Sequence, residues 1–288
     1  MRRWSCACTA SPTRRRCGSP WPNGWPTGSA SWPTTCGTGR SSVPVPRRGG
    51  WRLDRLTADF LAVAHAVSPD RPVHLVGHDW GSTQSWAFVV DEVAARRIAS
   101  FTSISGPSLD LVRPWLAGAS RSPRRALAAA GQAVRSSYVL VLRIPRLPEA
   151  ALRRQGAALH RRLLTQSGVA DPDRFVADTF LDDARHGLEL YRQNADRARH
   201  PRPVPPGAVT VPVQLLVPTR DPYLSPSLYD DLRVVVPDLV RHDIAAGHWV
   251  QLSHPDEVAD RIAGHVDRVE AATASSSSPS GAVAPADG

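Results

Sequence analysis

The stretch of sequence that decides the fold is Val73-His74-Leu75-Val76-Gly77-His78-Asp79-Trp80-Gly81, an apolar run that breaks into Gly-His-Asp-Trp-Gly. This order is typical of a buried strand, a sharp turn between two glycines, and a helix. Gly77 and Gly81 let the backbone pass close on both sides of the turn, so the side chain of Asp79 is held exposed above the end of the strand. The pattern predicts a nucleophile elbow.

The residue at the centre of this turn sets the chemistry that the turn would support. Most enzymes with such an elbow have Ser there, whereas a carboxylate such as Asp79 implies an alkyl-ester intermediate instead of an acyl-enzyme. Gly-x-Asp-x-Gly alone is equally typical of a plain polar turn. The interpretation therefore depends on whether the chain also supplies a general base and an acid that orients this base.

Candidates for the acid and the base follow the elbow in the chain. Residues 211–217 form an apolar run that predicts a buried parallel strand, and Asp221 lies in the loop after it. Residues 238–243 predict another short strand, and Gly-His at His248 follows it. Catalytic groups of open parallel sheets lie at the carboxyl ends of strands. We therefore predict that Asp79 is the nucleophile, that His248 activates water, and that Asp221 orients His248.

The rest of the pattern predicts an α/β fold with a helical insertion. Residues 37–110 and 206–270 are expected to form the core, and residues 111–205, where strand patterns give way to Arg- and Ala-rich helical stretches, are expected to form a cap. Within the core we predict helices over Leu53–Val67 and Ser82–Arg97, and strands over Val73–Gly77 and Ile98–Ser105. Residues 271–288 are rich in Ala, Ser, Pro and Gly, and we predict a disordered tail there.

With these motifs, the chain from about Gly37 to Val266 resembles the epoxide hydrolase and haloalkane dehalogenase branch of the α/β-hydrolase fold family. The segment from Gly77 to Leu109 most resembles the hydrolase half of two-domain proteins that carry a short-chain dehydrogenase behind it. The resemblance implies a mostly parallel sheet with an inserted helical cap, and an oxyanion-binding backbone N–H at Trp80. It also implies a small hydrophobic epoxide as substrate, with no metal or organic cofactor.

Two tyrosines distinguish the branches of this family. An epoxide hydrolase needs donors for the epoxide oxygen as it becomes an alkoxide, and Tyr hydroxyls suit this task. The resemblance assigns it to two cap tyrosines, which match Tyr138 in Ser-Ser-Tyr and Tyr191 in Gly-Leu-Glu-Leu-Tyr-Arg-Gln-Asn. Each could also be an amphipathic Tyr on a cap helix. We therefore predict an epoxide hydrolase, with a haloalkane dehalogenase that uses the same three residues as the alternative.

Composition bounds the location and the partners. No stretch is long and apolar enough to span a membrane, and no apolar segment of a secretion signal is present, so we expect a cytoplasmic protein.

Residues 1–50 hold all four Cys, four of the nine Trp and eight Arg, but no Asp or Glu. Such an arm is typical of nucleic-acid binding, and its Cys spacing fits no common zinc pattern. We predict no nucleic-acid partner, and keep an inactive truncated family member or a basic-arm binding protein as alternatives.

A shifted reading frame accounts better for this first segment. The chain has no Lys, as expected of a GC-rich gene. If the last base of each codon is read with the next two, Ser31–Gly37 permits Leu-Ala-Asp-Asp-Leu-Arg, which resembles a strand of the family, and Cys8-Thr9-Ala10 permits the His-Gly of its oxyanion loop. We predict that residues 1–36 are translated out of frame and that the N-terminal strands are missing or garbled. The edge of the Val73–Gly77 strand should then be left open.

Overall fold

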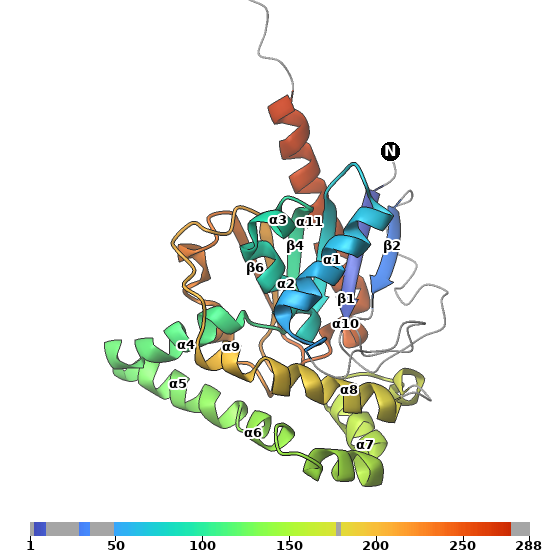
Figure 1. The fold of residues 1–288 in the computed structure, drawn as a ribbon, viewed down its shortest axis with the longest axis vertical. Helices are drawn as coiled ribbons and strands as arrows, with labels where there is room; N and C mark the ends of the chain where they lie inside the picture. Colours follow the sequence, from blue (N-terminus) through green and yellow to red (C-terminus); the bar gives the residue numbers. More distant parts are fainter. Residues whose placement is uncertain (1–2, 10–28, 35–48, 177–179, 278–288) are drawn as a thin grey trace, which may run out of the picture.

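Figure 1 shows a computed structural model that describes residues 3–9, 29–34, 49–176 and 180–277. Its centre is a six-stranded sheet in the order β2-β1-β3-β4-β5-β6, and every pair of neighbouring strands is parallel. The strands are β1 (Arg3–Thr9), β2 (Ser29–Thr34), β3 (Val73–His78), β4 (Ile98–Ile104), β5 (Val213–Pro218) and β6 (Leu239–Ile244). Because all of these strands run the same way, their carboxyl ends meet at one edge of the sheet.

Helices cover both faces of the sheet because its central strands are apolar on both sides. Every residue of β3 and β5 is buried, as parallel strands between two helical layers require. Successive side chains of a strand point to opposite faces, so Leu75 packs in one hydrophobic cluster and Val76 in another. The first cluster includes α1 (Leu53–Val67) and α2 (Trp80–Val90); the second includes α10 (Val250–Ser253) and α11 (Pro255–Ser277). The predicted α/β fold class is confirmed.

Helices occupy the chain between β4 and β5, where strand patterns disappear from the sequence. They are α4 (Leu109–Ala117), α5 (Pro123–Arg135), α6 (Tyr138–Leu142), α7 (Leu147–Gln166), α8 (Phe180–Gln193) and α9 (Ala195–Arg199). Short 3-10 turns are η1 (Gly118–Arg121), η2 (Pro172–Phe175), η3 (Pro226–Tyr229) and η4 (Leu232–Val234). The cap lies beyond the carboxyl ends of the strands, and α5 and α6 run along its edge away from the sheet (Figure 1). Within the described ranges, no helix is both long and apolar enough to cross a membrane.

The N-terminal strands differ from the prediction. β1 pairs with β3, with Ser5 opposite His74 and Thr9 opposite His78, and β2 pairs with the outer side of β1. The edge of β3 is therefore paired, contrary to the expectation of an open edge, whereas the expectation that these strands are garbled stays a prediction. Parallel pairing uses main-chain N–H and C=O groups, so it tolerates an unusual side-chain composition, and Pro33 lies on the edge strand, where a missing N–H is tolerated.

The helix expected over Ser82–Arg97 is interrupted. α2 begins earlier, at Trp80, and ends at Val90, and the short α3 (Glu92–Ala95) follows. Asp91 between them is extended, and its carboxylate accepts the N–H groups of Val93 at 3.1 Å and Ala94 at 2.9 Å. A side chain that caps a new helix start competes with continuation of the old one, which the apolar periodicity does not reveal.

The C-terminal tail is more ordered than predicted. α11 continues to Ser277, whereas disorder was expected from Ala271 onward. Ala is the best helix former, and the hydroxyls of Thr273 and Ser275 donate to main-chain carbonyls four residues earlier, each at 2.9 Å. Satisfied hydroxyls therefore let the helix run into the Ser-rich segment. The prediction for residues 278–288 lies outside the described residues.

Candidate active site

The turn between β3 and α2 is a strained elbow. Asp79 has φ 55° and ψ −123°, which residues with a side chain rarely adopt, and its N–H donates to the carbonyl of Ile104 at 3.0 Å. A Cβ on Gly77 would lie 2.6 Å from the carbonyl oxygen of Gly81, and a Cβ on Gly106 would lie 2.2 Å from that of Asp79. The close approach of these segments holds Asp79 above the carboxyl edge of the sheet, with 34% of its side chain exposed.

His248 lies between the two acids that the sequence predicts. Its Nδ1 is 2.8 Å from Oδ2 of Asp221, and its Nε2 is 4.0 Å from Oδ1 of Asp79. An ionised carboxylate only accepts hydrogen bonds, so we assign the proton of a neutral His248 to Nδ1, which leaves the lone pair of Nε2 on the side of Asp79. The structure brings the three residues together at the carboxyl edge of the sheet. Their catalytic roles stay a prediction.

Burial and charge act on these three groups in opposite directions. Burial alone would lower the pKa of His248, but the carboxylates of Asp221 and Asp79 hold that pKa above its ordinary value. Burial alone would raise the pKa of Asp221, but the charge and hydrogen bond of His248 hold it below its ordinary value. Burial does raise the pKa of Asp79, although His248 and the N–H of Trp80 oppose this shift. Asp221 is therefore the more readily ionised of the two acids.

The loop after β5 fixes the orientation of Asp221. Its Oδ1 accepts the N–H groups of Tyr223 at 2.8 Å and Leu224 at 3.2 Å, while Oδ2 faces His248. Arg135 on α5 donates to the main-chain carbonyl of Asp221 at 2.9 Å. Each carboxylate oxygen thus has its own donor, so the carboxylate is held in the one orientation that serves His248.

The two cap tyrosines predicted from the sequence lie together beside the elbow. The ring centroids of Tyr138 and Tyr191 are 6.3 Å apart, and the two rings meet edge to face. Tyr191 also contacts Trp80 edge to face, with ring centroids 5.0 Å apart. Burial raises the pKa of both tyrosines, and the negative charge of Asp79 raises each of them further. Both hydroxyls therefore keep their protons within electrostatic reach of the Asp79 carboxylate.

A buried amide explains why Arg-Gln-Asn follows Tyr191. Oδ1 of Asn194 accepts the N–H of Leu53 at 2.9 Å, and its Nδ2 donates to the carbonyls of Trp51 at 2.7 Å and Leu190 at 2.9 Å. Oε1 of Gln193 accepts the N–H of Trp51 at 3.0 Å. These bonds tie the end of α8, which carries Tyr191, to the segment that begins α1 in the core.

A second buried amide holds the other side of the cap. Nε2 of Gln132 donates to the carbonyl of Tyr223 and to the hydroxyl of Ser136, each at 2.9 Å. Its Oε1 accepts the N–H of Ser225 at 2.8 Å. Gln132 therefore links α5, just before Tyr138, to the loop that carries Asp221. The sequence does not reveal this residue, because an isolated Gln in an Arg- and Ala-rich helix gives no local signal of a distant partner.

Two aromatic residues that sequence reasoning did not assign also border the site. The ring of Tyr223 lies edge-on to His248 and Tyr138, at centroid distances of 4.9 and 5.4 Å, and burial raises the pKa of Tyr223 to about 12. Nε2 of His78 donates to the carbonyl of His248 at 3.0 Å. Burial, helped by the neighbouring His248, lowers the pKa of His78 to about 3, so its ring stays neutral. His78 lies inside the Gly-His-Asp-Trp-Gly motif, so the sequence did contain a signal that could have identified it.

An oxyanion hole at this site would need donors that face the carboxyl group of Asp79. The backbone N–H of Trp80, at the start of α2, acts to lower the pKa of Asp79 and stays the predicted donor. The family's second donor would follow β1, and residues 10–28 lie outside the described residues. Among the residues that are described, no three His, Cys, Asp or Glu side chains are grouped so that they could hold a metal ion.

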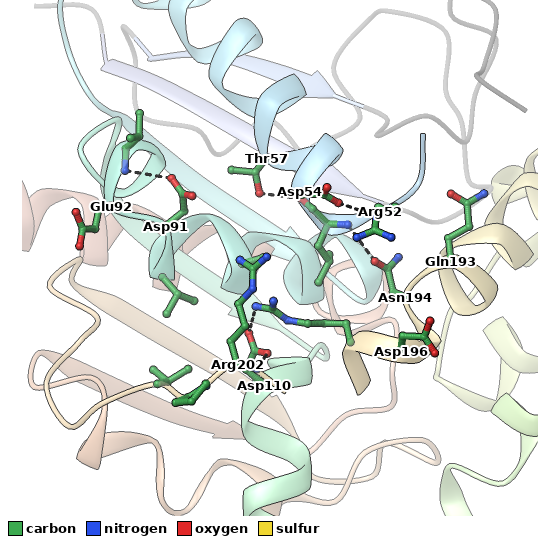
Figure 2. A pocket seen from close by; sticks show the side chains of 17 residues that line it. Arg52, Asp54, Thr57, Asp91, Glu92, Asp110, Gln193, Asn194, Asp196 and Arg202 are labelled. Carbon is green, nitrogen blue, oxygen red and sulfur yellow. Dashed lines mark hydrogen bonds and ion pairs between the residues drawn. The ribbon is translucent and has the colours of Figure 1, made fainter. Parts of the chain in front are cut away.

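A separate cavity of about 590 Å³ lies beside α1 and α9 and is lined mainly by charged and polar side chains (Figure 2). Arg52 pairs with Asp54 at 3.1 Å, and Arg197 pairs with Asp110 at 2.5 Å, so several of these charges are balanced within the protein. The residues of the elbow site do not line it: Asp79, Tyr138, Tyr191, Asp221 and His248. This cavity is therefore distinct from the candidate active site.

Comparison with known proteins places this fold and this elbow in one family. The alpha/beta hydrolase fold matches residues 35–255, and the chain belongs to that family. It is 37% identical over 246 residues to "Probable oxidoreductase EphD" of Mycobacterium tuberculosis, and the match covers 80% of this chain and 40% of the relative. It is 24% identical over 196 residues to "Epoxide hydrolase 3" of Mus musculus, and the match covers 64% of this chain and 49% of the relative. The chain thus spans less than half the length of these relatives.

Solved structures share the fold at low sequence identity. An epoxide hydrolase of Bacillus megaterium in complex with an inhibitor has a TM-score of 0.69 and 16% identity, and the match covers 93% of this chain and 94% of that one. Epoxide hydrolase I of potato, Solanum tuberosum, has a TM-score of 0.66 and 15% identity, and the match covers 93% of each chain. The predicted α/β-hydrolase fold, with a parallel sheet and an inserted helical cap, is confirmed.

Proposed function

We propose that this protein is an epoxide hydrolase that forms a vicinal diol through a covalent ester of Asp79. The observation that carries the proposal is the contact between the rings of Tyr138 and Tyr191, 6.3 Å apart, with Tyr191 packed against the residue that follows Asp79. The charge of Asp79 raises the pKa of each tyrosine. Protonated donors beside a carboxylate nucleophile are what opening of an epoxide requires. The mouse relative and the similar structure from Bacillus megaterium are both named epoxide hydrolases, which supports the same activity.

In the first half of the proposed reaction, a carboxylate oxygen of Asp79 attacks one carbon of the epoxide. The bond from that carbon to the ring oxygen breaks, and the electron pair goes to the oxygen. Tyr138 and Tyr191 donate hydrogen bonds to this oxygen, and one of them transfers its proton as the negative charge develops. The product of this step is a hydroxyalkyl ester of Asp79.

In the second half, water releases the diol. Nε2 of His248 lies 4.0 Å from Asp79, so a water molecule bonded to this nitrogen would lie against the ester. His248 takes a proton from the water, whose oxygen attacks the ester carbonyl carbon, and the N–H of Trp80 stabilises the resulting oxyanion. Asp221 stabilises the charged imidazole and holds its orientation. Cleavage of the acyl–oxygen bond frees the diol as an alkoxide and leaves Asp79 as a carboxylic acid. The protons on His248 and on this carboxylic acid then pass to the alkoxide and to the tyrosinate that the first half left, which restores the starting protein.

A haloalkane dehalogenase would use the same three residues and is the second candidate. The indole of Trp80 beside the nucleophile favours it, because an indole N–H can stabilise a leaving halide. In this structure, however, the ring of Trp80 packs edge to face against Tyr191, with ring centroids 5.0 Å apart. The indole thus lies against one of the two tyrosines that epoxide opening would use, and this pair of tyrosines favours the epoxide hydrolase.

The two activities separate in a direct assay. Purified protein is incubated with styrene oxide and, in parallel, with a 1-bromoalkane of similar size, and diol and bromide are measured over time. We expect diol from the epoxide, little bromide from the haloalkane, and neither product from Asp79→Ala. Faster release of bromide than of diol would establish the dehalogenase instead, and diol formation that persists in Asp79→Ala would rule out both proposals.

A further inference from the structure

The outer edge of the cap exposes an unusual number of large apolar side chains. Six of them lie between α5 and the start of α7, with exposed fractions from 46% to 76%: Leu127, Val134, Leu140, Val141, Ile144 and Leu147. We call these six residues the cap edge. Helices α5 and α6 run one after the other along the side of the cap away from the sheet (Figure 1). The cap edge thus faces outward and contributes little to the core beneath it.

The exposed residues of α5 share one face of that helix. Leu127 and Val134 are seven residues apart, close to two full turns, so their side chains point the same way. Ala129 and Gln132, on the other side of α5, are buried against the rest of the protein. The helix therefore has an inner face that packs and an outer apolar face that packs against none of the described hydrophobic clusters.

The charge around the cap edge has one sign. Residues 111–148 contain seven Arg and no Asp or Glu. Arg125 is paired with Asp231, but no carboxylate among the described residues pairs with Arg124, Arg143 or Arg146. An apolar face flanked by unpaired cations is typical of a helix that lies in the interface of an anionic membrane, where apolar groups enter the lipid and Arg side chains contact phosphates.

We propose that the cap edge docks this protein on the surface of a phospholipid bilayer that carries negative charge. A second copy of the chain is a poorer occupant, because a symmetric contact would bring the same Arg-rich surfaces together without carboxylates between them. A bilayer supplies both the negative charge and the apolar medium. Such docking is peripheral, and it differs from spanning the membrane.

This docking would place the candidate active site next to the lipid. Helix α6 begins with Tyr138, whose ring contacts Tyr191 and Tyr223 on the inner side, and the same helix exposes Leu140 and Val141. One turn of helix therefore separates the site from the cap edge. The proposal goes beyond the proposed activity and does not depend on it, since docking can be measured without turnover.

Vesicle flotation tests the docking with the full 288-residue chain. Vesicles of phosphatidylcholine alone are compared with vesicles that contain phosphatidylglycerol, at low and high salt. We expect binding only to the anionic vesicles. The triple change L127S/V134S/L140S should abolish it, and R124Q/R146Q should weaken it by roughly thirtyfold. The control V93S/V234S removes two side chains that are 62% and 60% exposed but lie outside the cap edge, and it should bind as wild type does.

Comparing the cap variants with this control also distinguishes binding by the cap edge from binding by the basic first 50 residues, because those 50 residues are the same in every variant. If these residues alone caused binding, the cap variants and the control would float equally, and the proposal would be overturned. Photoactivatable phosphatidylglycerol offers a second readout on unmodified protein, with labelled peptides expected from residues 127–147 and not from 90–96. Labelling elsewhere, no binding to anionic vesicles, or a dimer that L127S/V134S/L140S dissociates would each contradict docking on lipid.

Discussion

Gly106 lies directly against the main chain of Asp79, so closely that a Cβ on Gly106 would be 2.2 Å from the Asp79 carbonyl oxygen and 2.6 Å from Cβ of Ser82. The contact joins the end of β4 to the elbow after β3. Because both neighbours are parts of rigid elements, neither can move away without moving the nucleophile. The position of Asp79 therefore depends on a residue 27 places further along the chain.

We predict that Gly106→Ala displaces Asp79 and lowers kcat/KM by about a hundredfold or more, since small displacements of a reacting group carry large costs. Gly131→Ala is the matched control, because a Cβ at Gly131 meets no atom within 4 Å. The control should keep its activity and gain up to about 1 kcal/mol of stability from better helix propensity. Steady-state kinetics with urea unfolding measures both. Equal activity of the two variants would show that the elbow is not sterically fixed.

The cap tyrosines should act on ester formation and not on its hydrolysis. Tyr138→Phe and Tyr191→Phe each remove one donor to the epoxide oxygen, so we expect each to slow ester formation by about a hundredfold. Single-turnover kinetics separates this step from release of the diol, and the release rate provides an internal control. If both variants form the ester at the wild-type rate, the tyrosines serve only as packing for the cap.

The pH dependence of ester hydrolysis should report His248. The neutral imidazole is the base, so hydrolysis should fail as pH falls through the pKa of His248. In the free protein the carboxylates of Asp221 and Asp79 hold that pKa above its ordinary value, whereas in the ester Asp79 carries no charge and Asp221 alone opposes the effect of burial. Asp221→Asn removes a negative charge that raises the pKa, and burial then acts in the lowering direction. The midpoint should therefore move to lower pH in this variant, with a lower maximal rate; a midpoint that stays or rises would contradict the pairing.

Local sequence patterns were sufficient for the elements that carry the elbow. The helix predicted over Leu53–Val67 has the same bounds in the structure, and the predicted β3 strand is one residue longer. Periodicity and glycine spacing reveal such elements because both act over a few residues. Gln132 could not be found this way, because its main-chain hydrogen-bond partners lie about 90 residues further along the chain. Tyr223 could not be found either, because it packs in a cluster of rings that come from three separate segments of the chain.

That the first 36 residues are translated out of frame remains a proposal about the gene. β1 ends at Thr9 opposite His78, beside the elbow, and Cys8-Thr9-Ala10 in the shifted frame permits the His-Gly of an oxyanion loop. The family match begins at residue 35. We therefore expect the nucleotide sequence upstream of the Gly37 codon to encode His-Gly and Leu-Arg in the shifted frame. A sequence that permits neither would end this idea and favour the basic-arm binding protein.

The shifted frame also predicts a kinetic difference. An oxyanion forms when water attacks the ester, but not when Asp79 attacks the epoxide carbon. A frame-corrected protein would gain one oxyanion donor, so it should hydrolyse the ester about a hundredfold faster or more while forming it at an unchanged rate. Equal hydrolysis rates in the two proteins would show that the loop after β1 contributes no such donor.

The central claim is that Asp79 becomes esterified, and mass spectrometry of a trapped intermediate tests it most directly. His248→Gln removes the base for hydrolysis but leaves ester formation, which does not need the oxyanion loop. After incubation of this variant with styrene oxide, the peptide that contains Asp79 should gain the mass of one epoxide molecule, and His248→Gln/Asp79→Asn should gain none. An unmodified Asp79 peptide, or an adduct at any other residue, would contradict the account.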